Sequence, residues 1–426
     1  MKARVFPPAF ALSAVVATLT LHAGDWPQWR GPNRDGKAQG EQALTTLPAS
    51  AKPLWAIPIG KGQGGAVISN GKLAVVHEVE KDGKKLEAAL LLDAANGKTI
   101  WEKTFAESWQ FGNEYGPGPR CSAMVDGDLV FVQGAKGVLA CLQLSDGKIL
   151  WSADYDKDWG AKWLGGNLPG SKGTGATRHG NNGPPVADDK HIYAPVGSPT
   201  GASLVAFEKR TGKMVWKSGT DFAAYAALML GELGGVKQVV MASAAALSGF
   251  RASDGKQLWS VPLKTDAARN IVTPILQGDT VTAASFSVGA FQLRIRNTGD
   301  GQETDQVWAT RDVRTNMSTP VQQGAQFYGL GTGTQATTFV CVDAATGKQR
   351  WSQPGFPENA SIINLGGQLL VHTSPGELVL VQVNPEKYVE QGRMQVSGRT
   401  WHFPAYANGV LYVKDNRQLA AIRLAP

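Results

Sequence analysis

Asp93-Ala-Ala-Asn-Gly-Lys-Thr-Ile-Trp101 is the stretch that decides the fold, because the chain repeats its pattern four more times. The other copies are Gln143-Leu-Ser-Asp-Gly-Lys-Ile-Leu-Trp151, Glu208-Lys-Arg-Thr-Gly-Lys-Met-Val-Trp216, Arg251-Ala-Ser-Asp-Gly-Lys-Gln-Leu-Trp259 and Asp343-Ala-Ala-Thr-Gly-Lys-Gln-Arg-Trp351. Each copy places a glycine (Gly97, Gly147, Gly212, Gly255 and Gly347) four residues before its tryptophan. Repeats with a period of roughly 40 to 50 residues are typical of arrays and propellers.

The local chemistry of the repeat predicts a hairpin. Gly accepts a positive φ without a Cβ clash, so an Asn-Gly, Asp-Gly or Thr-Gly pair between apolar runs forms a tight turn. An apolar strand such as 138–142 precedes the turn, and a strand carrying the tryptophan follows it. Upstream lies another strand pair, 122–132, whose turn is Asp126-Gly127. One repeat is therefore four antiparallel strands, a to d, which is one blade of a β-propeller.

Weaker copies of the repeat set the number of blades. One runs from Thr273 to Trp308 without the Gly-Lys pair, and another begins at Ile362 and lacks the tryptophan. The last, 401–424, has no strand d, whereas 53–59 resembles a strand d with no partners before it. We expect an all-β, eight-bladed propeller whose N-terminal strand completes the last blade. Seven blades remain an alternative if one weak repeat is misread.

The ends of the chain predict an exported protein. Lys2 and Arg4 precede an apolar stretch and a small-residue site near position 23, so residues 1–23 are interpreted as a secretory signal peptide. Residues 24–50 form an irregular segment and 51–426 the propeller. We expect a periplasmic or secreted monomer that does not span the membrane. The net charge of +7 is spread over scattered residues, which argues against nucleic-acid binding.

Two further expectations concern packing. The segment from Trp26 to Gly36 is rich in Pro, Arg and Asn, and we expect its two tryptophans to clasp the outside of the ring beside the closing strand. Cys141 and Cys341 hold equivalent positions of separate blades, which lie too far apart for a disulfide, and Cys121 and Cys141 belong to strands a and c, which are not adjacent. We therefore expect all three cysteines to be free and buried.

The repeat Asp-x-x-x-Gly-Lys-x-x-Trp resembles the tryptophan-docking repeat of pyrroloquinoline quinone (PQQ) propellers, and Trp26-Pro-Gln-Trp-Arg-Gly-Pro-Asn-Arg-Asp-Gly36 resembles the opening of exported PQQ-binding-like repeat proteins. The stretch 118–127 is similar to the second blade of that group. The resemblance implies that the repeat tryptophans pack between blades. It implies less about function, because the superfamily contains quinoprotein dehydrogenases and the propeller subunit of the outer-membrane β-barrel assembly machinery. This chain lacks the adjacent cysteines typical of the former and the lipid-attachment cysteine common in the latter.

Candidate functional residues lie in two long connections between blades, 103–119 and 152–183, since long loops on a rigid scaffold commonly carry function. Further candidates stand at the start of an expected strand a, where side chains can face the channel. The ligand- or partner-facing candidates are Trp109, Tyr115, Arg120, Trp163, Arg178, His179, Arg314 and Asn316. A channel ringed by such residues suits an anionic or sugar-like ligand or an extended peptide. Alternatively, the aromatic residues only pack the loops onto the rim.

A weak metal candidate is the acidic stretch with Asp154, Asp156 and Asp158, but Trp159 and Gly165 occupy the positions where a calcium loop needs Gly and Glu. A solvated acidic loop fits better. We predict no cofactor and favour an exported, non-catalytic propeller that binds an envelope protein or ligand. A PQQ- and Ca²⁺-dependent dehydrogenase and a polysaccharide-binding or -cleaving propeller are the alternatives.

Overall fold

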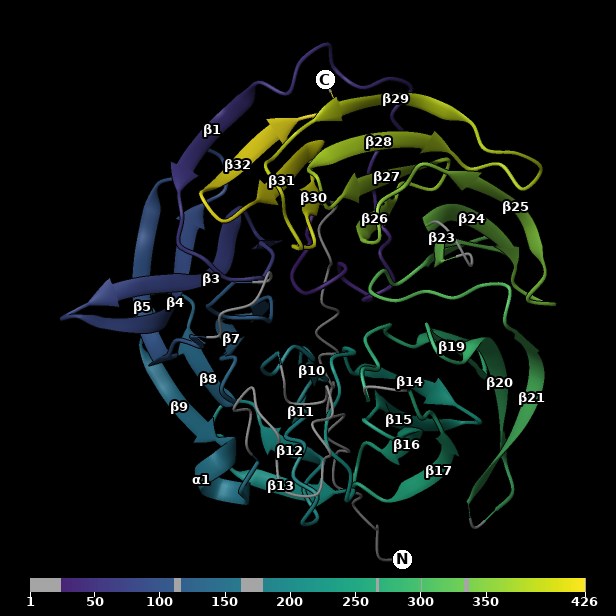
Figure 1. Cartoon of the computed structure of the whole chain (residues 1–426). Coiled ribbons are helices and arrows are strands. Elements are labelled where there is room, and N and C mark those ends of the chain that lie inside the picture. Colours follow the sequence, from purple (N-terminus) through teal and green to yellow (C-terminus); the bar gives the residue numbers. More distant parts are fainter. Residues whose placement is uncertain are drawn as a thin grey trace, which may run out of the picture.

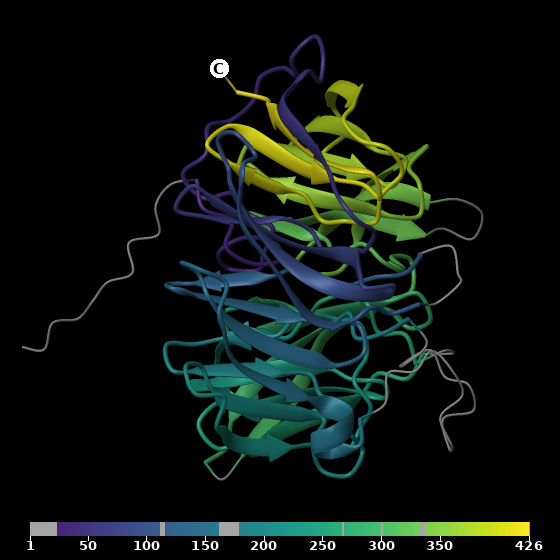
Figure 2. The ribbon, with the colours of Figure 1, turned by 90° about the vertical axis from the view of Figure 1, so that its left-hand side faces the viewer.

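The computed structural model describes residues 24–110, 116–161, 179–265, 268–299, 301–332 and 337–425. Within these residues, thirty-two strands form eight four-stranded antiparallel sheets arranged in a ring (Figure 1). This architecture confirms the eight-bladed β-propeller. The one helix of the described residues, α1 (Tyr155–Trp159), follows the outer strand of the second blade and lies at the edge of the ring (Figure 2). Among the described residues, no helix has the length and apolar character needed to cross a membrane.

The first four blades follow one another along the chain. Blade 1 comprises β2 (Val67–Ser69), β3 (Lys72–Lys81), β4 (Lys84–Asp93) and β5 (Thr99–Glu107). Blade 2 comprises β6 (Met124–Asp126), β7 (Leu129–Gln133), β8 (Val138–Gln143) and β9 (Ile149–Asp154). Blade 3 comprises β10 (Val186–Ala187), β11 (His191–Ala194), β12 (Leu204–Glu208) and β13 (Met214–Ser218). Blade 4 comprises β14 (Met229–Leu233), β15 (Val236–Ala242), β16 (Ala246–Arg251) and β17 (Gln257–Pro262).

The remaining blades complete the circle. Blade 5 comprises β18 (Ile275–Gln277), β19 (Thr280–Ser285), β20 (Gly289–Asn297) and β21 (Gln302–Thr310). Blade 6 comprises β22 (Val321–Gln323), β23 (Gln326–Thr332), β24 (Thr337–Asp343) and β25 (Gln349–Pro354). Blade 7 comprises β26 (Ala360–Asn364), β27 (Gln368–Thr373), β28 (Glu377–Gln382) and β29 (Glu390–Gln395). Blade 8 comprises β30 (Ala405–Ala407), β31 (Val410–Lys414), β32 (Gln418–Arg423) and β1 (Pro53–Pro58).

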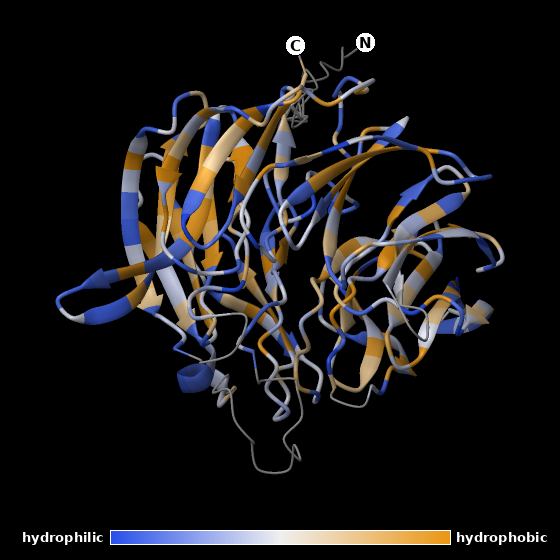
Figure 3. Ribbon diagram, turned by 45° about the horizontal axis from the view of Figure 1, so that its top comes forward, coloured by the Kyte–Doolittle hydropathy of each residue, from blue (hydrophilic) through white to orange (hydrophobic). Residues whose placement is uncertain are grey.

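Strand β1 closes the ring, as the unpaired N-terminal repeat fragment predicted. It pairs antiparallel with β32, with Trp55 opposite Ala421. The closure joins the two ends of the chain in one sheet, so blade 8 cannot form until the whole chain has been made. Apolar residues gather on the inner strands of each blade (Figure 3), and their side chains are buried where neighbouring sheets pack face to face.

The two faces of the ring differ. The a–b and c–d turns share one face, called here the turn face. In blade 1 the two turns are joined by a hydrogen bond of 2.9 Å from Ala94 N to Gly71 O. The d–a connections and the b–c turns share the opposite face, the loop face. There Asn181 N donates to Ala135 O at 2.8 Å, which joins a connection to a b–c turn.

Tryptophans of the outer strands connect each blade to the next at six seams. The indole N–H donates to a backbone carbonyl in the c–d turn of the following blade at 2.8–3.0 Å. These pairs are Trp55 with Ala94, Trp101 with Leu144, Trp151 with Lys209, Trp216 with Ala252, Trp308 with Ala344 and Trp351 with Asn384. At five of these seams the ring also lies against the turn glycine, where a Cβ would have no space.

Two seams depart from this arrangement. After blade 4, Trp259 donates to Gln238 of its own blade at 2.6 Å. Blade 5 lacks the Gly-Lys turn, and the buried Gln238 instead donates to Gln302 of blade 5 at 2.9 Å. The sequence pattern grouped Trp259 with the other repeat tryptophans, and the structure separates it from them. After blade 7, which has no tryptophan, Leu44 and Leu47 of the N-terminal segment join the core of the last blades.

The N-terminal segment lies mainly inside the ring, so the expected position of Trp26 and Trp29 on its outside is wrong. Trp26 forms a bridge with Ile68 on the inner strand β2, and Lys37 forms one with Asn364 on β26. Residues 25–37, called here the plug, therefore cross the channel. The physical reason is burial: Trp26 is 1% exposed at the axis, and no outer surface of a blade would cover it as fully. The plug also contacts blade 8, because Trp26 stacks on Phe403 with ring centres 6.4 Å apart. Beyond the plug, Glu41 accepts hydrogen bonds from the Asn408 and Gly409 backbone N–H groups of blade 8.

Replacing Gly212 by Ala tests the seam contact. Gly212 has φ +69°, and an added Cβ would lie 2.5 Å from the Trp151 ring. Gly71 has nearly the same φ, +71°, with open space around it. Both substitutions impose the left-handed penalty of roughly 1–2 kcal/mol. We expect Gly212→Ala to lower the free energy of unfolding by about 1–3 kcal/mol more than Gly71→Ala does, because the added methyl group overpacks the seam.

The measurement is the free energy of unfolding from urea denaturation of both variants. Equal destabilisation by Gly212→Ala and Gly71→Ala would show that the Trp151 contact does not restrict the turn.

Candidate functional site

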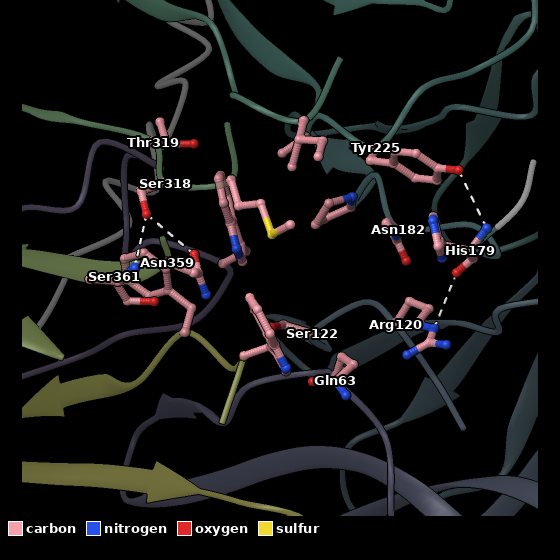
Figure 4. Close-up of a pocket in the computed structure, with 18 of the residues that line it drawn as sticks. Gln63, Arg120, Ser122, His179, Asn182, Tyr225, Ser318, Thr319, Asn359 and Ser361 are labelled. Atoms are coloured by element: carbon pink, nitrogen blue, oxygen red, sulfur yellow. Dashed lines mark hydrogen bonds between the residues drawn. The ribbon is translucent and has the colours of Figure 1, made fainter. Parts of the chain in front are cut away.

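A cavity of about 210 Å³ lies on the ring axis and faces the connections that precede each strand a. All eight blades and the plug contribute to its lining (Figure 4). The lining residues are Trp29, Gln63, Arg120, Ser122, His179, Asn182, Pro184, Tyr225, Ala227, Arg269, Ile271, Met317, Ser318, Thr319, Asn359, Ala360, Ser361, Trp401 and Phe403. Their convergence follows from the fold, because the inner strands of successive blades begin around one axis.

One wall of the cavity joins blades 2, 3 and 4. Arg120 Nε donates to His179 O at 3.1 Å, and Arg120 Nη2 donates to Gly116 O at 2.7 Å. His179 N donates to the Tyr225 hydroxyl at 3.3 Å, so a short chain of hydrogen bonds runs along this wall (Figure 4). Burial lowers the pKa of Arg120 to about 10, which leaves the guanidinium charged at neutral pH.

The opposite wall consists of small polar side chains from blades 6 and 7. Ser318 Oγ donates to Asn359 Oδ1 at 3.2 Å and accepts from Ala360 N at 2.9 Å. Thr319 and Ser361 stand beside them (Figure 4). Hydroxyl and amide groups therefore face the Arg120 wall across the cavity, and together they offer donors and acceptors from several directions.

The plug supplies the aromatic residue Trp29 and two buried arginines next to it. The guanidinium carbons of Arg30 and Arg34 lie 5.5 and 5.9 Å from the Trp29 ring centre. Arg30 donates to Pro320 O at 2.7 Å. Arg34 donates to Gln28 Oε1, Pro184 O and Pro185 O at 2.9–3.2 Å. These contacts fix the plug to the residues just before β10 of blade 3 and β22 of blade 6.

Burial lowers the pKa of both plug arginines, but both remain protonated at neutral pH. Desolvation lowers the pKa of Arg30 to about 10 and that of Arg34 to about 9. Neither side chain forms an ion pair with any of the residues that the structure describes. The centre of the ring therefore carries two positive charges at neutral pH.

A buried carboxyl group supports the Arg120 wall from behind. Glu87 on β4 accepts from Ala135 N at 3.1 Å and from Trp109 N at 3.3 Å. Ala135 O in turn accepts from Asn181 N, next to the lining residue Asn182. Burial raises the pKa of Glu87 to about 8, although the two backbone N–H groups and Arg120 oppose the shift.

A second buried polar cluster lies behind Gln63. Lys414 Nζ on β31 donates to Gly62 O at 2.8 Å and lies 3.0 Å from His402 Nε2. His402 also contacts Thr400 and Gly62. Burial lowers the pKa of Lys414 to about 7 and holds the pKa of His402 well below its ordinary value. The cluster ties the connection before β2 to blade 8 and stays outside the cavity lining.

The structure brings together only some of the residues that the sequence singled out. Arg120 and His179 line the cavity. Trp109 is 4% exposed and belongs to a buried apolar cluster made mainly of residues of blades 3 and 4. Arg314 and Asn316 stand on the connection before β22 without lining the cavity; Asn316 donates to Glu358 at 2.6 Å. Tyr115, Trp163 and Arg178 lie outside the described residues.

Sequence reasoning missed most of the lining. The sequence predicts Trp29 on the outside of the ring, and its long loops do not point to Tyr225, Arg269 or Trp401. One signal could have found them: apart from Trp29, the lining residues stand on or within a few positions of the inner strand a of a blade. Applying that position to every repeat, instead of only to the long loops, would have retrieved the ring.

The acidic stretch forms the start of α1. Asp154 is the N-cap and accepts from Lys157 N at 3.2 Å, and Asp158 accepts from Asp154 N at 3.0 Å. The three carboxylates thus serve a helix terminus where negative charge is favourable. In the described parts of the chain, no group of three His, Cys, Asp or Glu side chains is placed to hold a metal ion.

A quinone cofactor with Ca²⁺ would need a site for a flat anionic group and carboxylate ligands for the metal ion. The arginines and aromatic rings of the cavity fit a flat anionic group, but its described lining contains no Asp or Glu side chain to bind Ca²⁺. Cys121, Cys141 and Cys341 are separate, buried and free, in agreement with the sequence prediction. The residues therefore do not fit that pair, and no reaction step is assigned to it.

The comparisons with known proteins give the family. A family model described as outer membrane protein assembly factor BamB matches residues 87–353, more than half of the chain. The chain belongs to this family. Outer membrane protein assembly factor BamB of Shewanella oneidensis is 24% identical over 227 residues, which cover 48% of this chain and 49% of the relative. This chain therefore spans about half the length of that curated relative.

Solved structures are similar to this chain at low sequence identity. The computationally designed Ika8 protein is 9% identical with a TM-score of 0.54, and the match covers 86% of this chain and 100% of that one. BamB from Moraxella catarrhalis is 13% identical with a TM-score of 0.42, covering 88% and 97%. A europium-containing methanol dehydrogenase is 12% identical with a TM-score of 0.45, covering 93% and 89%. The first likeness concerns the fold alone.

Replacing Glu87 by Gln tests the buried carboxyl group. Its pKa is about 8 in the folded protein and near 4.5 when unfolded. The folded state thus binds the proton more tightly, and stability falls as pH rises between these two values. Gln keeps one oxygen as acceptor for both N–H groups and does not ionise. We expect the stability of the wild type relative to Glu87→Gln to fall by up to roughly 4 kcal/mol between pH 5 and 8.

Chemical denaturation at several pH values gives this difference. Glu232→Gln, at an exposed position on β14, is the control and should follow the wild type. A parallel pH dependence of the Glu87→Gln variant and the wild type would contradict a neutral, buried Glu87.

Proposed function

We propose that this protein is an exported, non-catalytic binding module of the cell envelope and that its loop face contacts a partner protein. The observation that carries the proposal is that the two ends of the central channel differ. The two ends of the plug, at Asp25 and Lys37, lie at a–b turns of the turn face, whereas all eight blades present residues to the axial cavity near the loop face.

The architecture supports a binding role because it is rigid where the contact would form. The seams, the closing strand β1 and the buried plug hold the inner strands in fixed positions, and connections on a rigid scaffold commonly carry recognition. Family membership supports an envelope partner, since the family description refers to outer membrane protein assembly. Export by residues 1–23 and the division at residues 24–50 and 51–426 are part of the same proposal.

Charge reversal on the two faces tests the proposal. The loop-face variant carries Lys61→Glu, Arg269→Glu and Arg311→Glu. The turn-face variant carries Lys148→Glu, Lys213→Glu and Lys348→Glu, which change the net charge equally. All six side chains are exposed, so both variants should fold with unchanged melting temperatures.

The measurement is affinity capture from envelope extracts with quantitative mass spectrometry. We expect a reproducible partner protein with the wild type, at least a tenfold loss with the loop-face variant, and retention with the turn-face variant. Absence of a reproducible partner, or equal losses with both variants, would overturn the proposal.

A further inference from the structure

The chemical composition of the axial cavity is unbalanced. Its described lining contains two arginines, three amide side chains, four hydroxyl groups of Ser and Thr, and the aromatic rings of Trp29, Tyr225, Trp401 and Phe403, but no carboxylate. A cavity that merely traps water has no need of this selection. The lining combines flat apolar surfaces with cations and with neutral hydrogen-bonding groups.

The charge around the cavity is positive on two sides. Arg269 is exposed in the lining and forms no hydrogen bond or ion pair with the described residues, and Arg120 stands on the neighbouring wall. Arg30 and Arg34 lie against Trp29, and Arg30 also lies 5.9 Å from the Phe403 ring. Charges in a partly enclosed site are poorly screened, so their combined potential favours an anion.

Neutral polar groups also point into the cavity without full satisfaction. Asn182 Oδ1 is buried and accepts no hydrogen bond from the described residues, and its side chain faces the cavity in Figure 4. A buried acceptor without a donor is costly, and a ligand hydroxyl would supply that donor. Ser361 and Thr319 extend the same polar rim on the opposite wall.

The size of the cavity suits one small ring. Its volume of about 210 Å³ is below the range of roughly 300–1,000 Å³ that is typical of small-molecule sites. A sugar ring presents an apolar face of C–H groups and an edge of hydroxyl groups, which matches aromatic rings beside amides and hydroxyls.

We propose that the axial cavity binds the carboxylate-bearing pyranose ring of a uronic acid, with Arg269 and Arg120 recognising the carboxylate and Trp29 and Asn182 contacting the ring. The ring arrives either as a free monosaccharide or as the end of an acidic polysaccharide. This inference rests on the proposed binding role of the loop face and names a ligand for it.

Calorimetric titration of the full protein tests the inference with four probes: galacturonate, trigalacturonate, the methyl ester of galacturonate and galactose. We expect an acidic probe to bind at least tenfold more tightly than the ester and galactose, and to weaken as salt is raised. Preference for galacturonate indicates a free acid, and preference for trigalacturonate indicates a chain end.

Three variants locate the site. Arg269→Gln removes an exposed cavity cation and should weaken the acidic probe about tenfold while leaving galactose unchanged. Arg311→Gln removes an exposed arginine on a neighbouring connection outside the lining and should have no effect. Asn182→Asp is isosteric, adds a negative charge to the cavity, and should abolish the preference for the acidic probe.

The inference is overturned if no acidic probe binds, if acid and ester bind equally, or if Arg269→Gln and Arg311→Gln weaken binding equally. An acidic peptide that competes with galacturonate at equal strength would overturn it in favour of a peptide site. Partner capture from envelope extracts is measured separately: partner capture without uronate binding overturns only this inference, and uronate binding without partner capture overturns only the proposed protein contact.

Discussion

The contact between an outer-strand tryptophan and the c–d turn of the next blade is the interaction on which the ring depends. The turn glycines Gly97, Gly147, Gly212, Gly255 and Gly347 adopt φ between 69° and 74°, and a Cβ at each would collide with the neighbouring indole. One residue thus meets two requirements, a left-handed turn and close approach of a ring. The indole N–H also bonds to a turn carbonyl, so each seam is fixed in direction as well as in distance.

Where this contact is missing, the chain uses other means to join its blades. The seam between blades 4 and 5 depends on the buried amides of Gln238 and Gln302, which bond to each other and to the Leu233 carbonyl. The seam after blade 7 is covered by Leu44 and Leu47 from the N-terminal segment. A polar network needs every group satisfied to be stable, whereas apolar cover does not. The seam between blades 4 and 5 should therefore be sensitive to loss of either amide, whereas the seam after blade 7 should accept other apolar side chains in place of Leu44 and Leu47.

The plug explains how a ring of eight blades avoids an empty centre. Eight inner strands cannot meet at the axis, and Trp26 with the stems of Arg30 and Arg34 fills that space. Burying two guanidinium groups is costly, and the carbonyls of Pro184, Pro185 and Pro320 compensate part of that cost. These carbonyls stand just before the inner strands β10 and β22, and Pro184 O also accepts from Leu228 N. The same arrangement places Trp29 in the cavity and positive charge beside it.

The sequence by itself determined the blades and the closing strand and favoured eight blades over seven, because hairpin turns and strand alternation are local properties that a repeat displays directly. It also indicated Arg120 and His179, which flank inner strands after long loops. Only the tertiary structure decided the position of the plug, since Arg30 reaches Pro320 across 290 residues. It likewise separated Trp259 from the other repeat tryptophans, because what an indole contacts depends on the turn of the following blade. The cavity, too, was decided only by the tertiary structure, because it forms only when the starts of eight inner strands surround one axis.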